Sequence, residues 1–526
     1  MTSGQPVERW RKIPNVAIGV PGDPDHVHEQ SPTVYVRDTV LVARFASAED
    51  DSFAGLEDTA SQLGWVIARE RDADDRRPMT IRFVSTAQDG SRTERVVTRM
   101  FIAATGRSTV PTVDAATLLR AYNAVDRSGD GVDVQLEHVL GLGPFMSPFM
   151  SPFMSPFMSP FMSPFMSPFM SGSSPVGSYA VPGAGGRQPV AYVGPPPARR
   201  ADDQVQGRRP RVAILDTGCG THDWLGFVAR GVDQPTVIGI DDPGTDPEIY
   251  PDLLGPLDGQ MDPLVGHGTF ITGLVHQEAP DADILTVRVL HGDGTVYEAD
   301  VVAALAGLLD YVLSADEHRI DVVNLSLGFY HEDVLDPTFP SEVRRLLVEL
   351  RRTGAVIVAS AGNDATTRPC YPAAFSRDPE DSDLAPLLSV TADNPNGTTA
   401  LFSNSGDWID VSIVGASVIS TMPDFGAGAE PLARTGTGGA DANRESLDPD
   451  DYLGGFGVWS GTSFAAPIVA GRIAAALADR VSSTTTAAER VALAQRAVAD
   501  VRTTIAAEKQ ALRAKFDARR SRNRPR

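Results

Sequence analysis

The sequence predicts an α/β protein whose larger region is a doubly wound, mostly parallel β-sheet. Between residues 206 and 482, short apolar runs alternate with longer stretches of helical spacing, as a doubly wound sheet requires. Residues 1–140 show a different order, with strand-like runs around two helical stretches, and predict a small N-terminal α+β domain. Residues 141–205 form a linker between the two, and residues 483–526 predict a C-terminal helix with a basic tail.

The larger region contains both kinds of element in alternation. The run 212–215 is unbroken and apolar, as in a parallel strand that is buried on both faces. Within 300–314, Val302, Leu305 and Leu309 recur at helical spacing, which predicts a helix facing the sheet. The expected strands are 211–216, 236–240, 284–290, 321–327, 355–360, 387–392 and 409–414, and the expected helices are 267–277, 300–314, 341–353 and 462–478.

The N-terminal region predicts a small antiparallel sheet covered by two helices. Its expected strands are 40–45, 65–69, 79–84, 96–102 and 132–137, and its expected helices are 53–63 and 113–125.

One segment of this region has the spacing of a calcium-binding EF-hand loop, with oxygen ligands at loop positions 1, 3, 5 and 12 and Gly131 at position 6. The candidate ligands are Asp126, Ser128, Asp130 and Glu137. Position 8 is acidic here, although it is normally apolar. The alternating apolar residues after Gly131 favour a turn into a strand, and Ca²⁺ binding is the alternative.

The linker begins with seven tandem copies of Pro-Phe-Met-Ser at residues 144–171. A proline at every fourth position removes backbone donors and excludes both a helix interior and a central strand, which predicts an extended tether. The Gly/Pro-rich sequence that follows predicts disorder to about residue 205.

Three short motifs place an aspartate, a histidine and a serine in settings suited to nucleophilic acyl transfer. Asp216 follows the apolar strand in VAILDTG, His267 opens a helix in GHGTF, and Ser463 opens another in SGTSFAAP. A serine hydroxyl is a weak nucleophile and needs an adjacent base. Imidazole serves as that base at neutral pH, and a buried carboxylate holds its tautomer.

A fourth motif supplies a donor for the oxyanion. The strand expected at 355–360 leads into Ala361-Gly362-Asn363. An asparagine amide at a strand end can donate to a tetrahedral intermediate, and the start of the helix after Ser463 directs its dipole at the same developing charge.

Together these motifs resemble those of the subtilisin-like serine proteases, the subtilases, over about residues 206–482. The resemblance implies a serine endopeptidase that acts on proteins or peptides through an acyl-enzyme and needs no cofactor for its chemistry. It implies Asp216, His267 and Ser463 as the triad and Asn363 as the oxyanion donor. It also implies that Ser326, Leu327 and Gly328 form the edge that pairs with the substrate backbone. The family usually has a second histidine three residues after the catalytic one, where this chain has Phe270.

The resemblance also bears on the N-terminal domain, since many subtilases carry such a domain as a propeptide that assists folding and plugs the cleft. An intramolecular inhibitor is one expectation, and a sensing or partner-binding domain is the other. The alternative for the whole chain is a catalytically restrained regulatory or scaffold protein. If the enzyme cuts after large apolar residues, self-cleavage is expected between Phe145 and Phe169, whereas a passive repeat is the favoured alternative.

Composition excludes several other functions. The chain of 526 residues has 46 basic and 68 acidic side chains, a net charge of −22, which argues against general nucleic-acid binding. It has no GxxxxGK phosphate-binding motif and no apolar stretch that could cross a membrane. The apolar stretch Val16 to Val20 is too short for a signal-peptide core, so a cytoplasmic location is expected.

The remaining candidates are two cysteines and two histidines. Cys219 and Cys370 follow Asp216 and Asn363 closely, so both are expected near the active site. Reduced, inert thiols are favoured over a regulatory role. His222 is expected to support a loop, and His276 is expected to be solvated.

Overall fold

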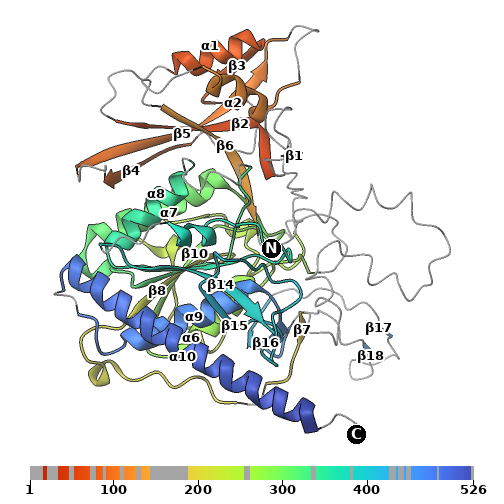
Figure 1. Ribbon diagram of the computed structural model, residues 1–526, viewed down its shortest axis with the longest axis vertical. Coiled ribbons are helices and arrows are strands. Elements are labelled where there is room, and N and C mark those ends of the chain that lie inside the picture. The colour runs from red at the N-terminus through yellow and green to blue at the C-terminus, as the bar shows by residue number, and fades with distance from the viewer. Residues whose placement is uncertain are drawn as a thin grey trace, which may run out of the picture.

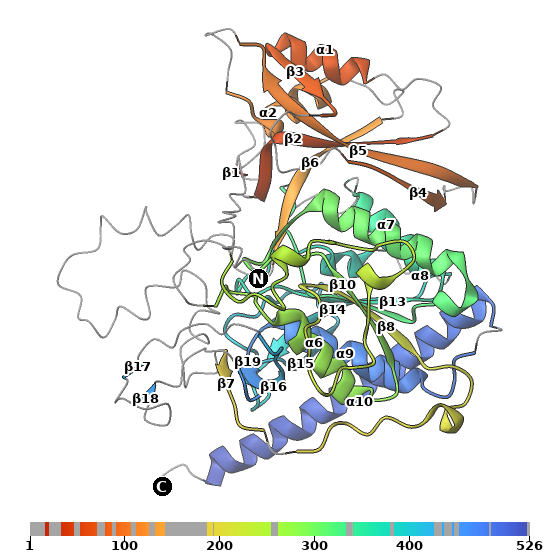
Figure 2. The same ribbon diagram turned by 180° about the vertical axis from the view of Figure 1, so that it is seen from behind.

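The computed structural model describes residues 16–19, 33–46, 53–70, 79–86, 91–106, 112–125, 132–141, 187–192, 194–253, 261–332, 339, 341–378, 383–425, 434–435, 444–445, 452–482 and 485–522. Two bodies are visible, an N-terminal domain (residues 16–141) that lies against a C-terminal domain (residues 187–522) (Figures 1 and 2). The Pro-Phe-Met-Ser repeats lie outside the described residues.

The C-terminal domain is built on a seven-stranded parallel sheet in the order β15-β14-β13-β12-β8-β10-β9. The strands are β8 (Arg211–Asp216), β9 (Ala229–Arg230), β10 (Asp283–Arg288), β12 (Val322–Leu325), β13 (Val356–Ser360), β14 (Leu387–Asp393) and β15 (Val411–Val414). The chain leaves β8 toward β10 and returns to β12 on the other side, so the topological switch point lies at β8. The doubly wound parallel sheet is confirmed.

The strand predicted at 236–240 does not form, and β9 takes the edge position beside β10 instead. Gly239 has a φ of 92°, which interrupts an extended strand. A Cβ at Gly239 would lie 2.4 Å from the carbonyl oxygen of Arg288, so this chain crosses the end of β10 too closely for most side chains.

Helices cover both faces of the sheet, because the strands are apolar on both faces. Val212 and Ile214 of β8 belong to one core, and Ala213 and Leu215 belong to the other. The first core is closed by α6 (His267–Glu278), α9 (Thr462–Leu477) and α10 (Ala487–Arg522), and the second by α7 (Glu298–Ser314) and α8 (Glu342–Arg352). The four helices predicted in this region are confirmed.

Two segments outside the predicted boundaries 206–482 belong to the C-terminal domain. The first half of α10 buries Ala494, Val498 and Ile505 in the core under α9, so this helix is not a separate region. Residues 187–205 were predicted to be disordered, but the described part of this segment lies on the domain. Arg200 pairs with Asp281 at 2.7 Å, and these specific ion pairs order a sequence whose composition alone indicates a flexible linker.

At the start of that segment, β7 (Gln188–Pro189) pairs with β19 (Phe456–Trp459), which in turn pairs with β16 (Val418–Thr421). A separate short ribbon joins β17 (Arg434–Thr435) to β18 (Arg444–Glu445). No helix within the described residues is long and apolar enough to span a bilayer.

The N-terminal domain has the predicted antiparallel sheet, and two helices pack on one face. Its central strands lie in the order β6-β2-β5-β3. Its elements are β1 (Val16–Gly19), β2 (Thr33–Phe45), α1 (Ala54–Gln62), β3 (Trp65–Ala68), β4 (Thr80–Thr86), β5 (Arg92–Ala104), α2 (Ala115–Asn123) and β6 (Val132–Gly141). Val40 and Val42 of β2 face the domain's own core beneath α1 and α2. Leu41 and Ala43 face the opposite way, into the core shared with α7 and α8.

The favoured interpretation of 132–137 as a strand is confirmed, and this corrects the calcium alternative at Glu137. The Glu137 carboxylate is fully buried within β6, where it pairs with Arg99 at 2.6 Å and accepts a hydrogen bond from Thr39 Oγ1 at 2.6 Å. These donors occupy the oxygens that the EF-hand spacing assigned to a cation. Asp126, Ser128 and Asp130 lie outside the described residues.

Buried ion pairs also cross between the domains. Arg95 of β5 pairs with Glu342 of α8 at 2.8 Å, and the exposed fractions of the two side chains are 1% and 0%. Arg95 also pairs with Asp133. The carboxylate of Glu349 accepts a hydrogen bond from the Thr86 backbone N–H at 2.8 Å. The face of the N-terminal sheet that meets α7 and α8 is therefore apolar with a few fully paired charges.

We expect Arg95→Met to lower the free energy of unfolding by about 3–5 kcal/mol, because it leaves Glu342 charged and buried after its main partner is removed. The measurement is urea unfolding of the full chain in a Ser463→Ala background. Arg82→Met is the matched control, since its pair with Glu94 is exposed and worth below about 1 kcal/mol. Equal losses in the two variants would contradict this assignment.

Candidate active site

Asp216 is the last residue of β8, at the carboxyl end of the sheet and at its switch point. The side chain is fully buried. Its Oδ1 accepts a hydrogen bond from the Thr217 backbone N–H at 2.8 Å and lies 2.7 Å from Nδ1 of His267. The carboxylate therefore orients the imidazole through Nδ1, which leaves Nε2 as the nitrogen that can exchange a proton with a nucleophile.

The two glycines around His267 explain how the histidine reaches Asp216. Gly266 caps α6 with a φ of 77°, so that His267 is the first residue of the helix. A Cβ at Gly268 would lie 2.1 Å from the carbonyl oxygen of Gly218, so only glycine allows the start of α6 to pack on the loop after β8. Glycine is therefore needed on both sides of His267, for the backbone conformation at Gly266 and for the close packing at Gly268.

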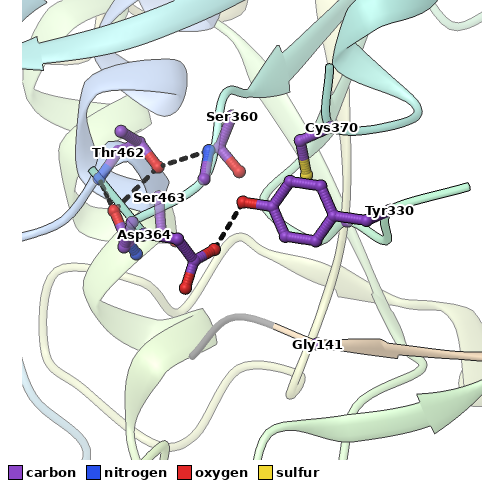
Figure 3. Close-up of a pocket in the computed structure, with 10 residues that line it drawn as sticks. Gly141, Tyr330, Ser360, Asp364, Cys370, Thr462 and Ser463 are labelled. Atoms are coloured by element: carbon purple, nitrogen blue, oxygen red, sulfur yellow. Dashed lines mark hydrogen bonds between the residues drawn. The ribbon is translucent and has the colours of Figure 1, made fainter. Parts of the chain in front are cut away.

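Ser463 lies in the first turn of α9, and Asn363 lies just beyond β13 at the same end of the sheet. The Oδ1 of Asn363 accepts hydrogen bonds from the backbone N–H of Thr462 at 2.9 Å and from its hydroxyl at 3.0 Å. These two bonds fix the amide so that Nδ2 is its donating group. Asn363 and Ser463 line one pocket, and Figure 3 shows it with Thr462 and Ser463 at its wall.

The predicted edge at Ser326, Leu327 and Gly328 lies beside this pocket. Ser326 Oγ donates to the carbonyl oxygen of Ser463 at 3.0 Å, which ties the edge to α9. Leu327 points into the core. Gly328 exchanges two backbone hydrogen bonds with Gly141, at 3.0 and 3.1 Å, so the end of β6 already pairs with this edge.

The other side of β6 meets a second edge that the sequence analysis missed. Strand β11 (Thr295–Tyr297) pairs antiparallel with β6, and Thr295 lies opposite Gly141. The end of β6 therefore runs between two backbone edges of the C-terminal domain. The β-branched and aromatic residues of Thr-Val-Tyr were the available signal, but a three-residue strand is too short for a reliable pattern.

A search for related proteins decides the family. The model described as Peptidase_S8, the subtilase family, matches residues 207–517, which is more than half of the chain. The chain belongs to the subtilases. This family comprises subtilisin-like serine endopeptidases, and their acyl-transfer chemistry needs no cofactor.

Among its relatives is an intracellular serine protease of Paenibacillus polymyxa, 27% identical over 294 residues that cover 52% of this chain and 68% of the relative. The major intracellular serine protease of Bacillus subtilis is 25% identical over 239 residues, covering 42% and 62%. Thermitase of Thermoactinomyces vulgaris is 28% identical over 238 residues, covering 43% and 70%. The matches therefore leave part of each relative, and about half of this subtilase, unaligned.

Phe270, which stands where subtilases usually have a second histidine, is fully buried in an aromatic cluster. Its ring lies 4.7 Å from Phe464 and 5.8 Å from Trp459, and Phe464 also lies 5.1 Å from the ring of His267. The cluster packs the first turn of α6 against the first turn of α9. Phe270 thus holds together the two helices that carry His267 and Ser463.

Glu248 is a buried residue of the site that the sequence analysis also missed. It accepts hydrogen bonds from the hydroxyl of Thr217, the hydroxyl of Thr269 at 2.5 Å and the backbone N–H of Gly268 at 3.1 Å. Burial raises the pKa of Glu248 to about 7. It joins the loop after Asp216 to the start of α6, and its position in an irregular loop gave no sequence signal.

The surroundings of both cysteines disfavour the thiolate form. Burial, with Glu248 nearby, raises the pKa of Cys219 to about 12, and burial also raises the pKa of Cys370. Cys370 lines the pocket of Ser463. Because the thiolate is the reactive form, these environments favour inert thiols, as the sequence analysis preferred.

The two other histidines differ in outcome. His222 supports its loop as expected, since Nε2 contacts the Gly455 carbonyl oxygen at 3.0 Å and Nδ1 accepts from the Trp224 N–H at 3.0 Å. The expectation that His276 is solvated was wrong. It is buried against Phe227, and burial lowers its pKa to about 4.

Glu248→Gln should change how stability depends on pH. The folded-state pKa of Glu248 is raised from 4.5 to about 7, so its contribution to stability is fully present below about pH 4.5 and is lost as pH rises through about 7. We expect the variant to gain up to about 3 kcal/mol of unfolding free energy relative to its parent across this interval. Urea unfolding at several pH values, in the Ser463→Ala background, measures it. A difference that stays constant with pH would contradict it.

Proposed function

We propose that this subtilase hydrolyses peptide bonds with Ser463 as nucleophile, His267 as general base and Asp216 as the group that orients His267. His267 takes the proton of the Ser463 hydroxyl as the oxygen attacks the carbonyl carbon, and later returns it to the leaving amine. Water then hydrolyses the acyl-enzyme by the same route. The short contact between Asp216 and His267 is the observation that carries this assignment.

Asn363 is proposed as the donor to the oxyanion. Its carbonyl oxygen is held by Thr462, next to the nucleophile, so the Nδ2 group is oriented before substrate binds. A donor fixed in advance costs no reorganisation during the reaction, which is why such groups contribute strongly to acyl transfer. The start of α9 adds its helix dipole at the same position.

We propose that a peptide substrate binds as an extended strand between Gly328 and β11, the place that the end of β6 now takes. In that case the N-terminal domain inhibits in cis, because its own backbone uses the hydrogen bonds that a substrate would need. The shared apolar core and the Arg95–Glu342 pair hold this domain in place. This favours the propeptide-like interpretation over a sensing domain.

We also propose that the enzyme acts in the cytoplasm. Support comes from two relatives that are named intracellular proteases.

Ser463→Ala should lower kcat by several orders of magnitude, and Asn363→Ala by about 10²–10³-fold with little change in KM, because the oxyanion donor acts mainly in the transition state. Initial rates on a fluorogenic peptide measure both, and Ser405→Ala, an exposed serine, is the control. Once the end of β6 has left the cleft, a fluorophosphonate probe should label the chain at Ser463 only. Failure to label a folded, cleft-accessible enzyme would favour the scaffold alternative.

Gly141→Pro should raise the initial peptidase rate of the uncleaved full chain, because proline cannot donate the hydrogen bond that Gly141 makes to the Gly328 carbonyl oxygen. Gly141→Ala is the matched control, since it keeps the N–H and should remain close to the unchanged chain. The comparison is made on freshly purified protein whose intact mass shows no cleavage. Equal rates in all three proteins would argue against inhibition by β6.

A further inference from the structure

A cluster of two histidines and one glutamate lies where β6 enters the C-terminal domain, away from the triad. His138 belongs to β6, and His331 and Glu332 follow the edge that ends at Gly328. One ligand atom of each side chain lies within 4.8 Å of the other two. The His138 Nε2 lies 3.0 Å from Glu332 Oε2, and His331 Nε2 lies 3.7 Å from the same oxygen.

We propose that His138, His331 and Glu332 bind a divalent transition-metal cation of the Zn²⁺ type that links the N-terminal domain to the C-terminal domain. Two imidazoles and a carboxylate are a common protein donor set for such cations. Ligand atoms in a tetrahedral zinc site lie about 3.4 Å apart, because each is about 2.0–2.1 Å from the metal. The two separations from the Glu332 carboxylate, 3.0 and 3.7 Å, lie on either side of this value, and all three ligand atoms lie within 4.8 Å of one another.

A second carboxylate orients the histidine of the N-terminal domain. Glu298 Oε2 lies 2.7 Å from His138 Nδ1 and accepts the His138 backbone N–H at 3.2 Å, and its other oxygen accepts from Gln135 at 3.0 Å. A carboxylate on Nδ1 selects the tautomer that presents Nε2 as a ligand, which is the arrangement behind most metal-binding histidines. A continuous series of contacts therefore runs from Gln135 through Glu298 and His138 to Glu332.

Aromatic packing holds both imidazoles in place. The ring of His138 stacks on Phe329 at 4.7 Å, and the ring of His331 stacks on Phe339 at 3.6 Å. The carbonyl oxygen of His331 accepts a hydrogen bond from Arg368 at 2.6 Å, which fixes the backbone between the two C-terminal ligands. Rings held in this way lose little conformational freedom when they bind a cation.

Charge and access also suit a cation. Glu298 and Glu332 contribute two negative charges, so one divalent ion bound by neutral imidazoles balances the cluster. The exposed fractions of the His138, His331 and Glu332 side chains are 3%, 11% and 13%. The two C-terminal ligands therefore provide a route to solvent, while His138 is enclosed.

The site lies close enough to the cleft for a bound cation to affect inhibition by the N-terminal domain, an inference that rests on the proposed function. His138 is three residues before Gly141, whose backbone pairs with the substrate edge. A cation bound by one ligand from β6 and two from the C-terminal domain would hold that strand in the cleft. Zinc would therefore strengthen inhibition by the N-terminal domain.

Isothermal titration calorimetry with Zn²⁺, and visible absorption with Co²⁺, test binding on the full chain carrying Ser463→Ala. We expect one high-affinity site that His331→Ala and Glu332→Gln abolish, and that Glu298→Gln weakens about 10–100-fold. His331→Ala leaves the contact between His138 and Glu298 intact, so the domains should still pack together in this variant. Circular dichroism of the variant then distinguishes loss of zinc binding from misfolding. His267→Ala and His318→Ala should bind as the parent does. Equal affinity in the parent and in His331→Ala would overturn the site.

A second measurement tests the consequence separately. Zn²⁺ should lower the initial peptidase rate of the uncleaved chain but not that of the His331→Ala variant. If zinc binds at one site and the rate is unchanged, the metal site stands and its proposed strengthening of inhibition is overturned. If zinc inhibits both proteins equally, it acts outside the cluster of His138, His331 and Glu332, and the proposed effect of this site on the peptidase rate is excluded.

Discussion

The candidate active site depends on one constraint, the burial of the Asp216 carboxylate at the end of a fully buried strand. A charge in such a place is costly unless hydrogen bonds compensate for it. The Thr217 backbone N–H and His267 both contact Oδ1, so the hydrogen bonds of this carboxylate gather on one of its two oxygens. Because the imidazole of His267 lies 2.7 Å from Asp216, α6 has to begin beside the end of β8. Gly268 allows the close packing of α6 on the loop after β8, and Glu248 accepts a hydrogen bond from the Gly268 backbone N–H.

The same kind of constraint shapes the contact between the two domains. Strand β2 sends Val40 and Val42 into one core and Leu41 and Ala43 into the other, because side chains alternate along a strand. The N-terminal sheet is therefore apolar on both faces, and removing it would expose a buried surface and the charged pair at Arg95. This buried contact, in addition to the covalent linker, joins the N-terminal domain to α7 and α8.

Much of this arrangement could be predicted because it rests on local patterns. The strand 211–216 was found from an unbroken apolar run, and α7 from leucines and valines at helical spacing. Asp216, His267, Ser463 and Asn363 were predicted as site residues because each follows or opens such an element, and their catalytic roles stay a proposal. The strand at 236–240 failed because Gly239 lies too close to β10 for an extended path, and that distance is not a local property. Self-cleavage in the repeats stays a prediction.

Local patterns in the sequence were enough to predict the parallel sheet, the subtilase family and the candidate Asp, His and Ser residues, since these depend on periodicity and short motifs within one element. The packing of distant segments showed which backbone edges enclose β6, that the described part of residues 187–205 packs on the domain, and that Glu248 lies near Asp216. It also decided that His138 meets His331 and Glu332, which are almost two hundred residues away in the chain. Such contacts join segments with no shared pattern, so they arise only when packing brings separate elements together.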